Sequence, residues 1–359
     1  MSDSSNQREM RTVHVNASTP YDVFIKKGIL DEVGELCSPI VRPTRCVIIS
    51  DDVVAPLYLD RVRASLERAG YTPPAFVFPH GESSKCAATY LDILSFLASE
   101  HIDRGGCIFA LGGGVVGDIS GFAAATYMRG IKYVQIPTTL LADVDSSVGG
   151  KCAIDIPEGK NLVGAFYNPS AVICDPETLR TLPEEYFSDG MAEVIKYAMI
   201  SDSSIFSLID EGYAKDNICE LIERCVSIKR EVVEADEREG GIRAILNFGH
   251  TTAHAIEAHS GFSISHGRAV GMGMVMMTMI SKNRGLCSSA TRKKLCQVLS
   301  DYSLDTECPY SAEVLLPYIF SDKKRADDKI TTVLSLGHGR CMLEPMSFEE
   351  LYAELKAIE

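Results

Sequence analysis

The sequence lacks the features that mark membrane-spanning, exported and nucleic-acid-binding proteins. Its longest apolar stretches, such as Gly271–Ile280, are too short and too interrupted to span a bilayer. Residues 1–10 are polar, which argues against a signal peptide and predicts a disordered tail. The net charge of −14 argues against nucleic acid and anionic membranes, so we expect neither as a partner.

Cysteine pairs with CxxC spacing are also absent. The twelve cysteines are scattered, and a chain of 359 residues with 46% hydrophobic residues can bury a large core without disulfides. We therefore expect free thiols and a cytoplasmic protein. The sequence has no internal repeat and no low-complexity segment.

The two halves of the chain differ in texture. The first contains short runs rich in β-branched residues, separated by helical patterns: Arg45–Ser50, Ala75–Phe78, Cys107–Leu111, Tyr133–Ile136 and Ala171–Asp175. This alternation predicts a Rossmann-like α/β domain over 11–183, with a mostly parallel sheet covered on both faces. Long amphipathic segments then predict an all-helical domain over 184–359: Ser203–Glu211, Asn217–Asp236 and Arg243–Ser260.

A glycine turn follows the third of these runs. Gly112-x-Gly114-x-x-Gly117 fits a dinucleotide-binding turn, in which glycines let the backbone approach phosphates. It fits a tight turn of an α/β sheet equally well. The usual ribose-binding acid is missing about 20 residues later, so Asp51 is the candidate. Asp118 would repel a pyrophosphate, so we expect it to face a ribose or a carboxamide.

The run 137–151 is too polar for a core strand and too ordered for a linker. It places Asp143 and Asp145 shortly before Gly149-Gly150-Lys151, which indicates an anion or nucleotide site. A nucleoside triphosphate is not expected. Asp145 stands where a Walker A loop needs glycine, and Cys152 stands where it needs Ser or Thr.

Histidines and a glutamate provide candidate metal ligands. His250 and His254 are four apart on a predicted helix and therefore share one face, while His266 can return to the same place. Glu193 and Lys196 lie in an apolar helix, where a buried role competes with a surface ion pair. Such a ligand set suits zinc. Spacing alone favours His250 and His254 as the pair and does not settle which histidine stays unbound.

Several basic residues stand in apolar or glycine-rich contexts and could bind a phosphate and a carboxylate. They are Arg129, Lys151, Lys160, Lys196, Lys229, Arg243 and the pair Lys323-Lys324.

These features together resemble the 3-dehydroquinate synthase family from about residue 45 to about residue 335. The matching motifs are GGGVVGD, AATYMRG, PTTLL, VDSSVGGK, GKNLVGAFY, MAEVIKYAMI, DEREGGIRAILNFGHT and SHG. The resemblance implies NAD and a divalent metal (zinc or cobalt) as cofactors. It implies a phosphorylated sugar acid as substrate, an active site in the cleft between the two domains, and a homodimer.

The resemblance also implies roles for individual residues. Metal ligands would be Glu193, His250 and His266, with His254 a proton-relay residue and Glu239 an acid–base residue. NAD contacts would be Asp51, Glu82, Lys85, Gly113, Gly114, Val115, Asp118, Thr138, Thr139 and Lys160. Substrate contacts would be Arg129, Asp145, Lys151, Asn161, Lys196, Lys229, Arg243, Asn247, His254 and one of Lys323 and Lys324. Those that also act catalytically would be Arg129, Lys151, Glu239, Asn247 and His254.

The sequence departs from the family pattern at a few positions. Asp143 stands where a neutral residue is common, and Cys152 where Thr is common. Thr252-Ala253 replace Phe-Gly, and Arg268 stands where Glu is frequent. None of these is a matched catalytic position, so we expect an active enzyme.

Three other functions compete with this interpretation. Another sugar phosphate cyclase, of the inosose or valiolone type, would not need a carboxylate site, for which Asn247, Arg243 and Lys229 are suited. A metal-dependent polyol or glycerol-phosphate dehydrogenase would place a second histidine ligand where this chain has Tyr197. A catalytically inactive ligand-binding regulator would not need every matched charged residue.

Overall fold

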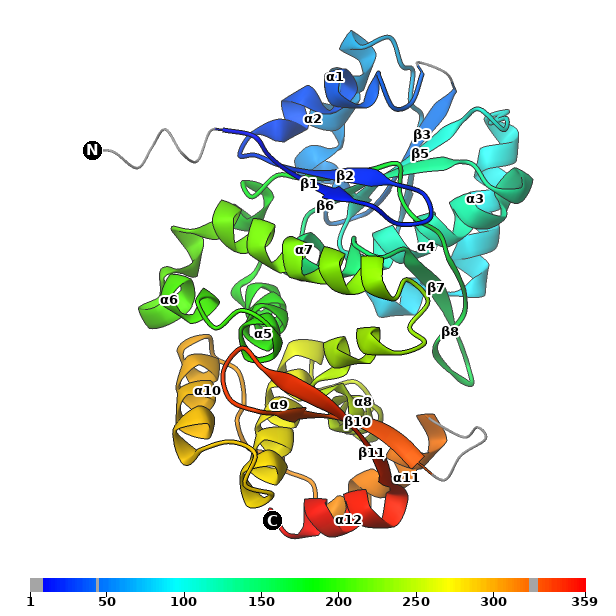
Figure 1. Ribbon diagram of the computed structural model, residues 1–359. Coiled ribbons are helices and arrows are strands. Elements are labelled where there is room, and N and C mark those ends of the chain that lie inside the picture. The colour runs from blue at the N-terminus through cyan, green and yellow to red at the C-terminus, as the bar shows by residue number, and fades with distance from the viewer. Residues whose placement is uncertain (1–8, 43–44, 323–328) are drawn as a thin grey trace. The chain divides into compact units, whose positions relative to one another are not determined.

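The chain forms two compact units, seen in the ribbon of the computed structural model (Figure 1). The structure describes residues 9–42, 45–322 and 329–359. The first unit comprises Met1–Pro183 and Lys229–Glu237, and the second comprises Glu184–Ile228 and Arg238–Glu359. Most of the predicted tail, residues 1–8, lies outside the described residues, as do Lys323 and Lys324.

A seven-stranded sheet forms the centre of the first unit. In spatial order its strands are β1 (Arg11–Val15), β2 (Tyr21–Ile25), β9 (Ala171–Cys174), β6 (Lys132–Pro137), β5 (Cys107–Gly112), β3 (Cys46–Asp51) and β4 (Ala75–Phe78). Only the β1–β2 pair is antiparallel. The five predicted runs are the five consecutive strands from β9 to β4, so the mostly parallel sheet is confirmed.

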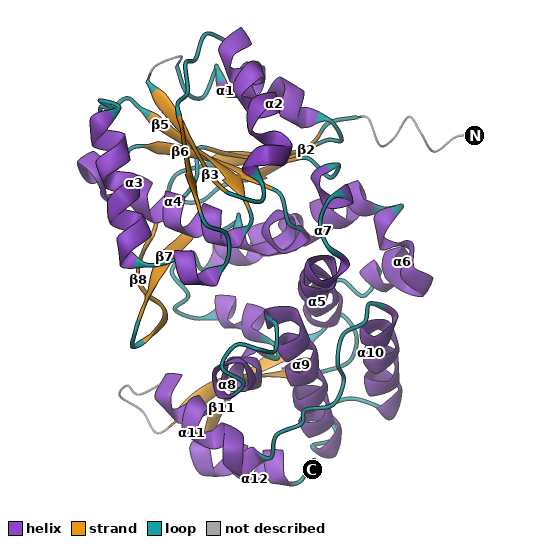
Figure 2. Cartoon of the chain, turned by 180° about the vertical axis from the view of Figure 1, so that it is seen from behind, coloured by secondary structure: helices purple, strands orange, loops and turns teal. Residues whose placement is uncertain are grey.

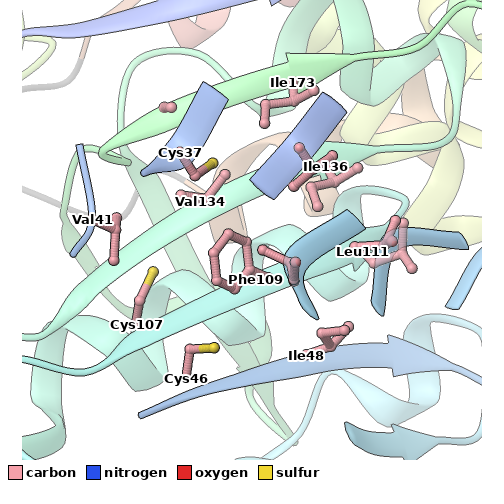
Figure 3. Packing of buried hydrophobic residues seen from close by; sticks show 14 of the residues in the cluster. Cys37, Val41, Cys46, Ile48, Cys107, Phe109, Leu111, Val134, Ile136 and Ile173 are labelled. Atoms are coloured by element: carbon pink, nitrogen blue, oxygen red, sulfur yellow. The ribbon is translucent and has the colours of Figure 1, made fainter. Parts of the chain in front are cut away.

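Helices cover both faces of this sheet. Neighbouring residues of a strand point to opposite faces, so β3, β5 and β6 each contribute side chains to two separate core clusters. Ile48 and Phe109 pack on one side with α1 (Val33–Cys37) and α2 (Ala55–Arg68) (Figure 3). The opposite side packs against α3 (Ala87–Ser99) and α4 (Gly114–Thr126). Every residue of β5 is buried, as expected for a parallel strand covered on both faces.

The first unit also contains an antiparallel hairpin that the sequence analysis did not include. It joins β7 (Lys151–Ile156) to β8 (Gly159–Phe166), shown in orange in Figure 2. Cys152 and Ile154 are buried in the same core cluster as α4. On β8, Leu162 and Phe166 are exposed.

The second unit is mostly helical, as predicted. It contains α5 (Glu184–Ile200), α6 (Ile205–Ile209), α8 (His250–His259), α9 (His266–Asn283), α10 (Ser289–Asp301), α11 (Ala312–Asp322) and α12 (Phe348–Lys356). One hairpin, β10 (Lys329–Ser335) with β11 (Cys341–Ser347), adds strands that the all-helical prediction lacked. Helix α7 (Ile218–Ala235) begins in this unit and ends in the first.

The predicted helix Arg243–Ser260 is interrupted in the structure. A 3-10 segment covers Ile242–Asn247, and α8 begins only at His250. Gly249, between the two, has a φ of 82°, a left-handed conformation that ends one helical path and starts another. None of the twelve cysteines, all of which the structure describes, forms a disulfide. Among the described helices, none combines the length and apolar character that crossing a bilayer requires.

Candidate functional site

The implied site residues fall in both units. The first unit contains Asp51, Glu82, Lys85, Gly113, Gly114, Val115, Asp118, Arg129, Thr138, Thr139, Asp145, Lys151, Lys160, Asn161 and Lys229. The second unit contains Glu193, Lys196, Glu239, Arg243, Asn247, His250, His254 and His266.

Three residues of the second unit form a cluster that could hold a metal ion. Glu193 comes from α5, while His250 and His266 are the first residues of α8 and α9. One potential ligand atom from each lies within 4.8 Å of the others. The Nε2 atoms of both histidines lie 3.4 Å from Oε1 of Glu193.

The donor set of this cluster fits a zinc ion or a similar divalent metal. Oε1 of Glu193 is buried and accepts no hydrogen bond from the described residues, although two imidazole nitrogens face it. A buried carboxylate oxygen without a partner is costly, and a cation between it and the imidazoles would remove that cost. Two imidazoles and one carboxylate are a common catalytic zinc set with an open position.

The buried helix α5 explains how a charged pair reaches this cluster. Every residue from Gly190 to Ile200 is buried, and Glu193 and Lys196 are 1% and 2% exposed. The ammonium of Lys196 donates to Oε2 of Glu193. The alternative of a surface ion pair is therefore wrong, and Glu193 keeps Oε1 directed toward the histidines.

Charge determines the protonation of the cluster. Burial alone would raise the pKa of Glu193, but Lys196 and His250 outweigh it and hold that pKa well below its usual range. Burial lowers the pKa of His250 despite the opposing effect of Glu193. Burial also opposes protonation of His266, yet Glu193 and Glu257 raise its pKa to about 10. Glu193 is thus ionised, and His250 is available in the neutral form that binds metal.

Contacts at Asp189 and Gly273 position the two helices that carry the histidines. Asp189, one turn before Glu193 on α5, accepts hydrogen bonds from Ser265 Oγ (2.6 Å) and Gly267 N (3.1 Å). These contacts hold both neighbours of His266. On α9, a Cβ at Gly273 would lie 2.1 Å from the carbonyl oxygen of Gly249, so only glycine lets α8 and α9 approach this closely.

His254 lies beside the cluster without belonging to it. Its ring is 5.6 Å from that of His250, edge to face, and its side chain is exposed. The structure therefore assembles His250 with His266 and Glu193, whereas spacing alone favoured His250 with His254. Nearby in sequence, Asn247 Nδ2 donates to Glu239 Oε1 at 3.0 Å, and Arg243 is almost fully buried.

The glycine turn of the first unit lies between β5 and α4, as a dinucleotide-binding turn requires. A Cβ at Gly113 would lie 3.0 Å from the Thr139 side chain, and one at Gly114 would lie 3.2 Å from Ser146. Thr138 N donates to the carbonyl oxygen of Gly112. The backbone of the glycine turn, which has no side chain at Gly113 and Gly114, thus packs against the polar run 137–151.

A buried lysine joins several of the implied NAD contacts. Lys85 Nζ lies 2.5 Å from Asp118 Oδ2, 2.6 Å from Asn161 Oδ1 and 3.9 Å from Glu82 Oε1. Lys160 lies 3.8 Å from the same Glu82 oxygen. Burial by itself lowers the pKa of Lys85, but Asp118 and Glu82 outweigh it and raise that pKa. The ammonium therefore offsets the negative charge of Asp118 behind the glycine turn.

Asp51 ends β3 beside the glycine turn, because Ser50 of β3 pairs with Leu111 of β5. Asp51 accepts hydrogen bonds from the amides of Val53 and Val54. Arg129, in the turn after α4, and Lys151, at the start of β7, are both exposed.

Two residues near the metal cluster were missed by the sequence analysis. Asp189 lies one turn before Glu193, and Glu257 lies two turns after His250, so helical spacing could have found both. Glu257 is buried, and its Oε2 lies 3.6 Å from His266 Nδ1.

Comparison with known proteins decides the family. Residues 75–189 match the model described as 3-dehydroquinate synthase N-terminal, and residues 190–325 match 3-dehydroquinate synthase C-terminal. The chain belongs to the 3-dehydroquinate synthase family. A 3-dehydroquinate synthase of Clostridium kluyveri is 42% identical over 96% of this chain and 98% of the relative. One of Clostridium acetobutylicum is 41% identical over 97% and 100%.

Solved structures place the family within a wider group of similar folds. A 2-deoxy-scyllo-inosose synthase complexed with carbaglucose-6-phosphate, NAD+ and Co2+ has a TM-score of 0.87 and 26% identity, covering 97% of this chain and 100% of that one. A 2-epi-5-epi-valiolone synthase from Streptomyces hygroscopicus with NAD+ and Zn2+ bound has a TM-score of 0.85 and 26% identity, covering 94% and 96%. A Schizosaccharomyces pombe glycerol dehydrogenase (TM-score 0.64, 16% identity, covering 98% and 90%) shares the fold alone.

Proposed function

We propose that this chain is a 3-dehydroquinate synthase. It converts 3-deoxy-D-arabino-heptulosonate 7-phosphate to 3-dehydroquinate and phosphate, a step of the shikimate pathway leading to aromatic amino acids. NAD and a divalent metal, zinc or cobalt, are its cofactors. The observation that carries the proposal is the cluster of Glu193, His250 and His266 in a chain that belongs to this family.

In this proposal, residues of the second unit bind the metal and transfer protons. Glu193, His250 and His266 would hold the metal, while Lys196 takes Oε2 of Glu193 and keeps Oε1 available. When bound, NAD takes up and returns a hydride, and the metal lowers the pKa of a substrate hydroxyl. His254 would relay a proton to or from bound substrate, a role that its exposure beside the cluster supports.

Acid–base and anion-binding roles follow from other contacts. Glu239 accepts a hydrogen bond from Asn247, which orients a carboxylate that can exchange protons. The glycine turn offers backbone N–H groups at the start of α4 to a pyrophosphate, and Lys85 offsets the charge of Asp118 there. Arg129 and Lys151 supply cationic groups for the phosphate of the substrate.

Two alternatives are weaker. The solved inosose and valiolone synthases favour a cyclase of their type, but they are 26% identical, against 41–43% for the curated 3-dehydroquinate synthases. A metal-dependent dehydrogenase is disfavoured because buried Tyr197 stands one turn after Glu193, at the position where we expect a second histidine ligand in such enzymes.

The deciding experiment is turnover of purified protein with the seven-carbon phosphate ester, NAD and zinc. We expect stoichiometric phosphate and 3-dehydroquinate by mass spectrometry, and no phosphate from glucose 6-phosphate, which lacks a carboxylate. Phosphate release from glucose 6-phosphate alone would instead indicate a cyclase of the inosose type. Release from neither substrate would contradict the proposal and leave a cyclase for another sugar phosphate or a regulator without catalytic activity. We further propose that the enzyme is a cytoplasmic lyase and a homodimer.

A further inference from the structure

Glu257 is a buried carboxylate next to the candidate metal cluster and has no role in the reaction proposed above. It lies on α8, is 7% exposed, and its Oε2 is 3.6 Å from Nδ1 of His266. Because α8 has 3.6 residues per turn, Glu257 lies on the same face as His250, two turns further along. The helix that supplies one candidate ligand thus also supplies a group that contacts a second ligand.

The two histidines present the same ring atoms to the cluster. His250 and His266 both direct Nε2 toward Oε1 of Glu193. Their Nδ1 atoms face outward, at 3.3 Å from the Phe248 carbonyl oxygen for His250 and toward Glu257 for His266. Both outward partners are acceptors, so each favours keeping the ring proton on Nδ1 when a metal ion replaces a proton on Nε2.

The outward partners differ in charge. The Phe248 carbonyl is neutral, whereas the Glu257 carboxylate is negative when ionised. A carboxylate that accepts from the distal nitrogen of a ligating imidazole fixes the ring and makes its other nitrogen a stronger donor. Removing such a partner lowers metal affinity by about 10- to 100-fold in known metal sites.

We propose that Glu257 is a positioning residue for the metal, acting through His266. It holds the ring with Nδ1 protonated and Nε2 directed to the ion, and its charge strengthens the metal bond. This inference rests on the proposed function, because it presupposes a metal at Glu193, His250 and His266. The alternative is a Glu257–His266 ion pair that only stabilises the fold.

Zinc affinity distinguishes the two roles. In competition with a chromophoric chelator, Glu257→Gln should bind zinc about 10- to 100-fold more weakly than the unaltered protein. Glu257→Asp, which keeps the charge but shortens the side chain, should recover part of the loss. The matched control is Glu220→Gln, which breaks the Glu220–Arg224 pair on α7 and should leave zinc affinity unchanged. Unchanged affinity in folded Glu257→Gln would overturn the proposal.

A second measurement needs no variant at position 257. In zinc-loaded, 15N-histidine-labelled protein, ring-nitrogen NMR should show His266 with Nδ1 protonated and Nε2 bound to metal, the assignment resting on loss of the signal in His266→Asn. Metal on Nδ1 would refute the role of Glu257 even if Glu257→Gln fails to fold.

The outcomes also distinguish failure of the positioning role from failure of the proposed metal site. If the unaltered protein binds no zinc, the metal site and the positioning role both fail. If zinc binds and His250→Ala loses it while Glu257→Gln does not, only the positioning role fails.

Discussion

Lys229 Nζ lies 3.0 Å from Asp145 Oδ2 and donates a 2.7 Å hydrogen bond to the Asp145 carbonyl oxygen, although 84 positions separate the residues. The pair joins α7 to the π-helical turn Ala142–Ser146 within the first unit. An ammonium that faces a carboxylate adds little net positive charge to its surroundings. The attraction of a phosphorylated substrate therefore depends on further cations.

Arg129 is the first cation that we expect to matter. Arg129→Ala should lower kcat/KM, and the ratio of the two values should correspond to more than about 1.5 kcal/mol of lost transition-state stabilisation. The reason is the loss of a charge-assisted hydrogen bond to phosphate. Lys151→Ala should act in the same direction. Steady-state kinetics at fixed salt checks both variants.

Lys356→Ala is the control for these substitutions. Lys356 forms an exposed ion pair with Glu313, far along the sequence from the site residues, and its loss should leave the kinetics unchanged. Rising salt should increase KM for the unaltered enzyme, since screening acts over ~8 Å at physiological ionic strength. Equal small effects of all three substitutions would refute the phosphate site.

Removal of metal should abolish turnover. Chelation should inactivate the enzyme and added zinc or cobalt should restore it, because three protein ligands with an open position are typical of a catalytic metal. His250→Ala should lose both metal, by elemental analysis, and activity. His14→Ala, at an exposed histidine paired with Asp22, should lose neither. Full activity of the metal-free protein would contradict the assignment.

NAD should be required without being consumed. The substrate becomes 3-dehydroquinate by loss of phosphate, with no net change of oxidation state, so the hydride must return within each turnover. Absorbance of NADH should stay near zero while phosphate accumulates. Build-up of NADH in proportion to substrate would instead indicate the dehydrogenase.

Asp143 should reduce stability at neutral pH. It is fully buried, its carboxyl oxygens have no hydrogen-bond partner of normal geometry among the described residues, and burial raises its pKa well above the usual 3.8 despite the opposing effect of the Cys174 thiol. A raised folded-state pKa means that the unfolded chain releases this proton first, so stability falls as pH rises above about 4. Asp143→Asn should therefore stabilise the protein at pH 7 by about 1 kcal/mol or more.

The measurement is the thermal midpoint at several pH values. The gain of Asp143→Asn should shrink as the pH falls toward 4, where the unfolded carboxyl also holds its proton. Asp60→Asn, at an exposed carboxylate paired with Arg63, should show no such trend. A pH-independent difference would mean that the ionisation of Asp143 does not control stability.

Gly273→Ala should weaken zinc binding without altering a ligand. The added Cβ would meet the Gly249 carbonyl at 2.1 Å, so α8 and α9 must separate, and His250 moves relative to His266. Gly271→Ala on the same helix is the comparison, because its nearest neighbour would be the Asp305 carbonyl at 3.1 Å. Zinc affinity should fall clearly more in Gly273→Ala, and equal affinities would refute this coupling.

Much of the first unit could be predicted because its buried strands are continuous β-branched runs. The hairpin Lys151–Phe166 could not, since its lysines, glycines, proline and acidic residues disfavour strands. Its pairing depends on contacts distant in sequence, such as burial of Cys152 and Ile154 against α4. The sequence also does not predict that residues 229–237 belong to the first unit, because the helical periodicity of α7 continues without a break across the boundary between the units.

The chemistry of the site was easier to predict than its geometry. A glutamate in an apolar helix and histidines one turn apart indicated a metal site. Local spacing then favoured His254, because nothing in helical periodicity shows that a later helix brings His266 to the same point. Tertiary packing at Asp189 and Gly273 determines that approach.

The first unit is built from two stretches of the chain that are separated in sequence, and this constrains the order in which the chain can fold during synthesis. Its early segments bind late ones: Asn16 N donates to Glu234, Ser18 to Glu237, and Asn168 to Glu237. None of these acceptors exists when the ribosome has translated only as far as Pro183. These contacts of the first unit can form only after residue 237 has emerged, by which time α5 and α6 have already left the exit tunnel. A fragment that ends at Pro183 would contain all seven strands of the sheet but lack these three acceptors, so separating the units with their contacts intact requires a graft of residues 229–237.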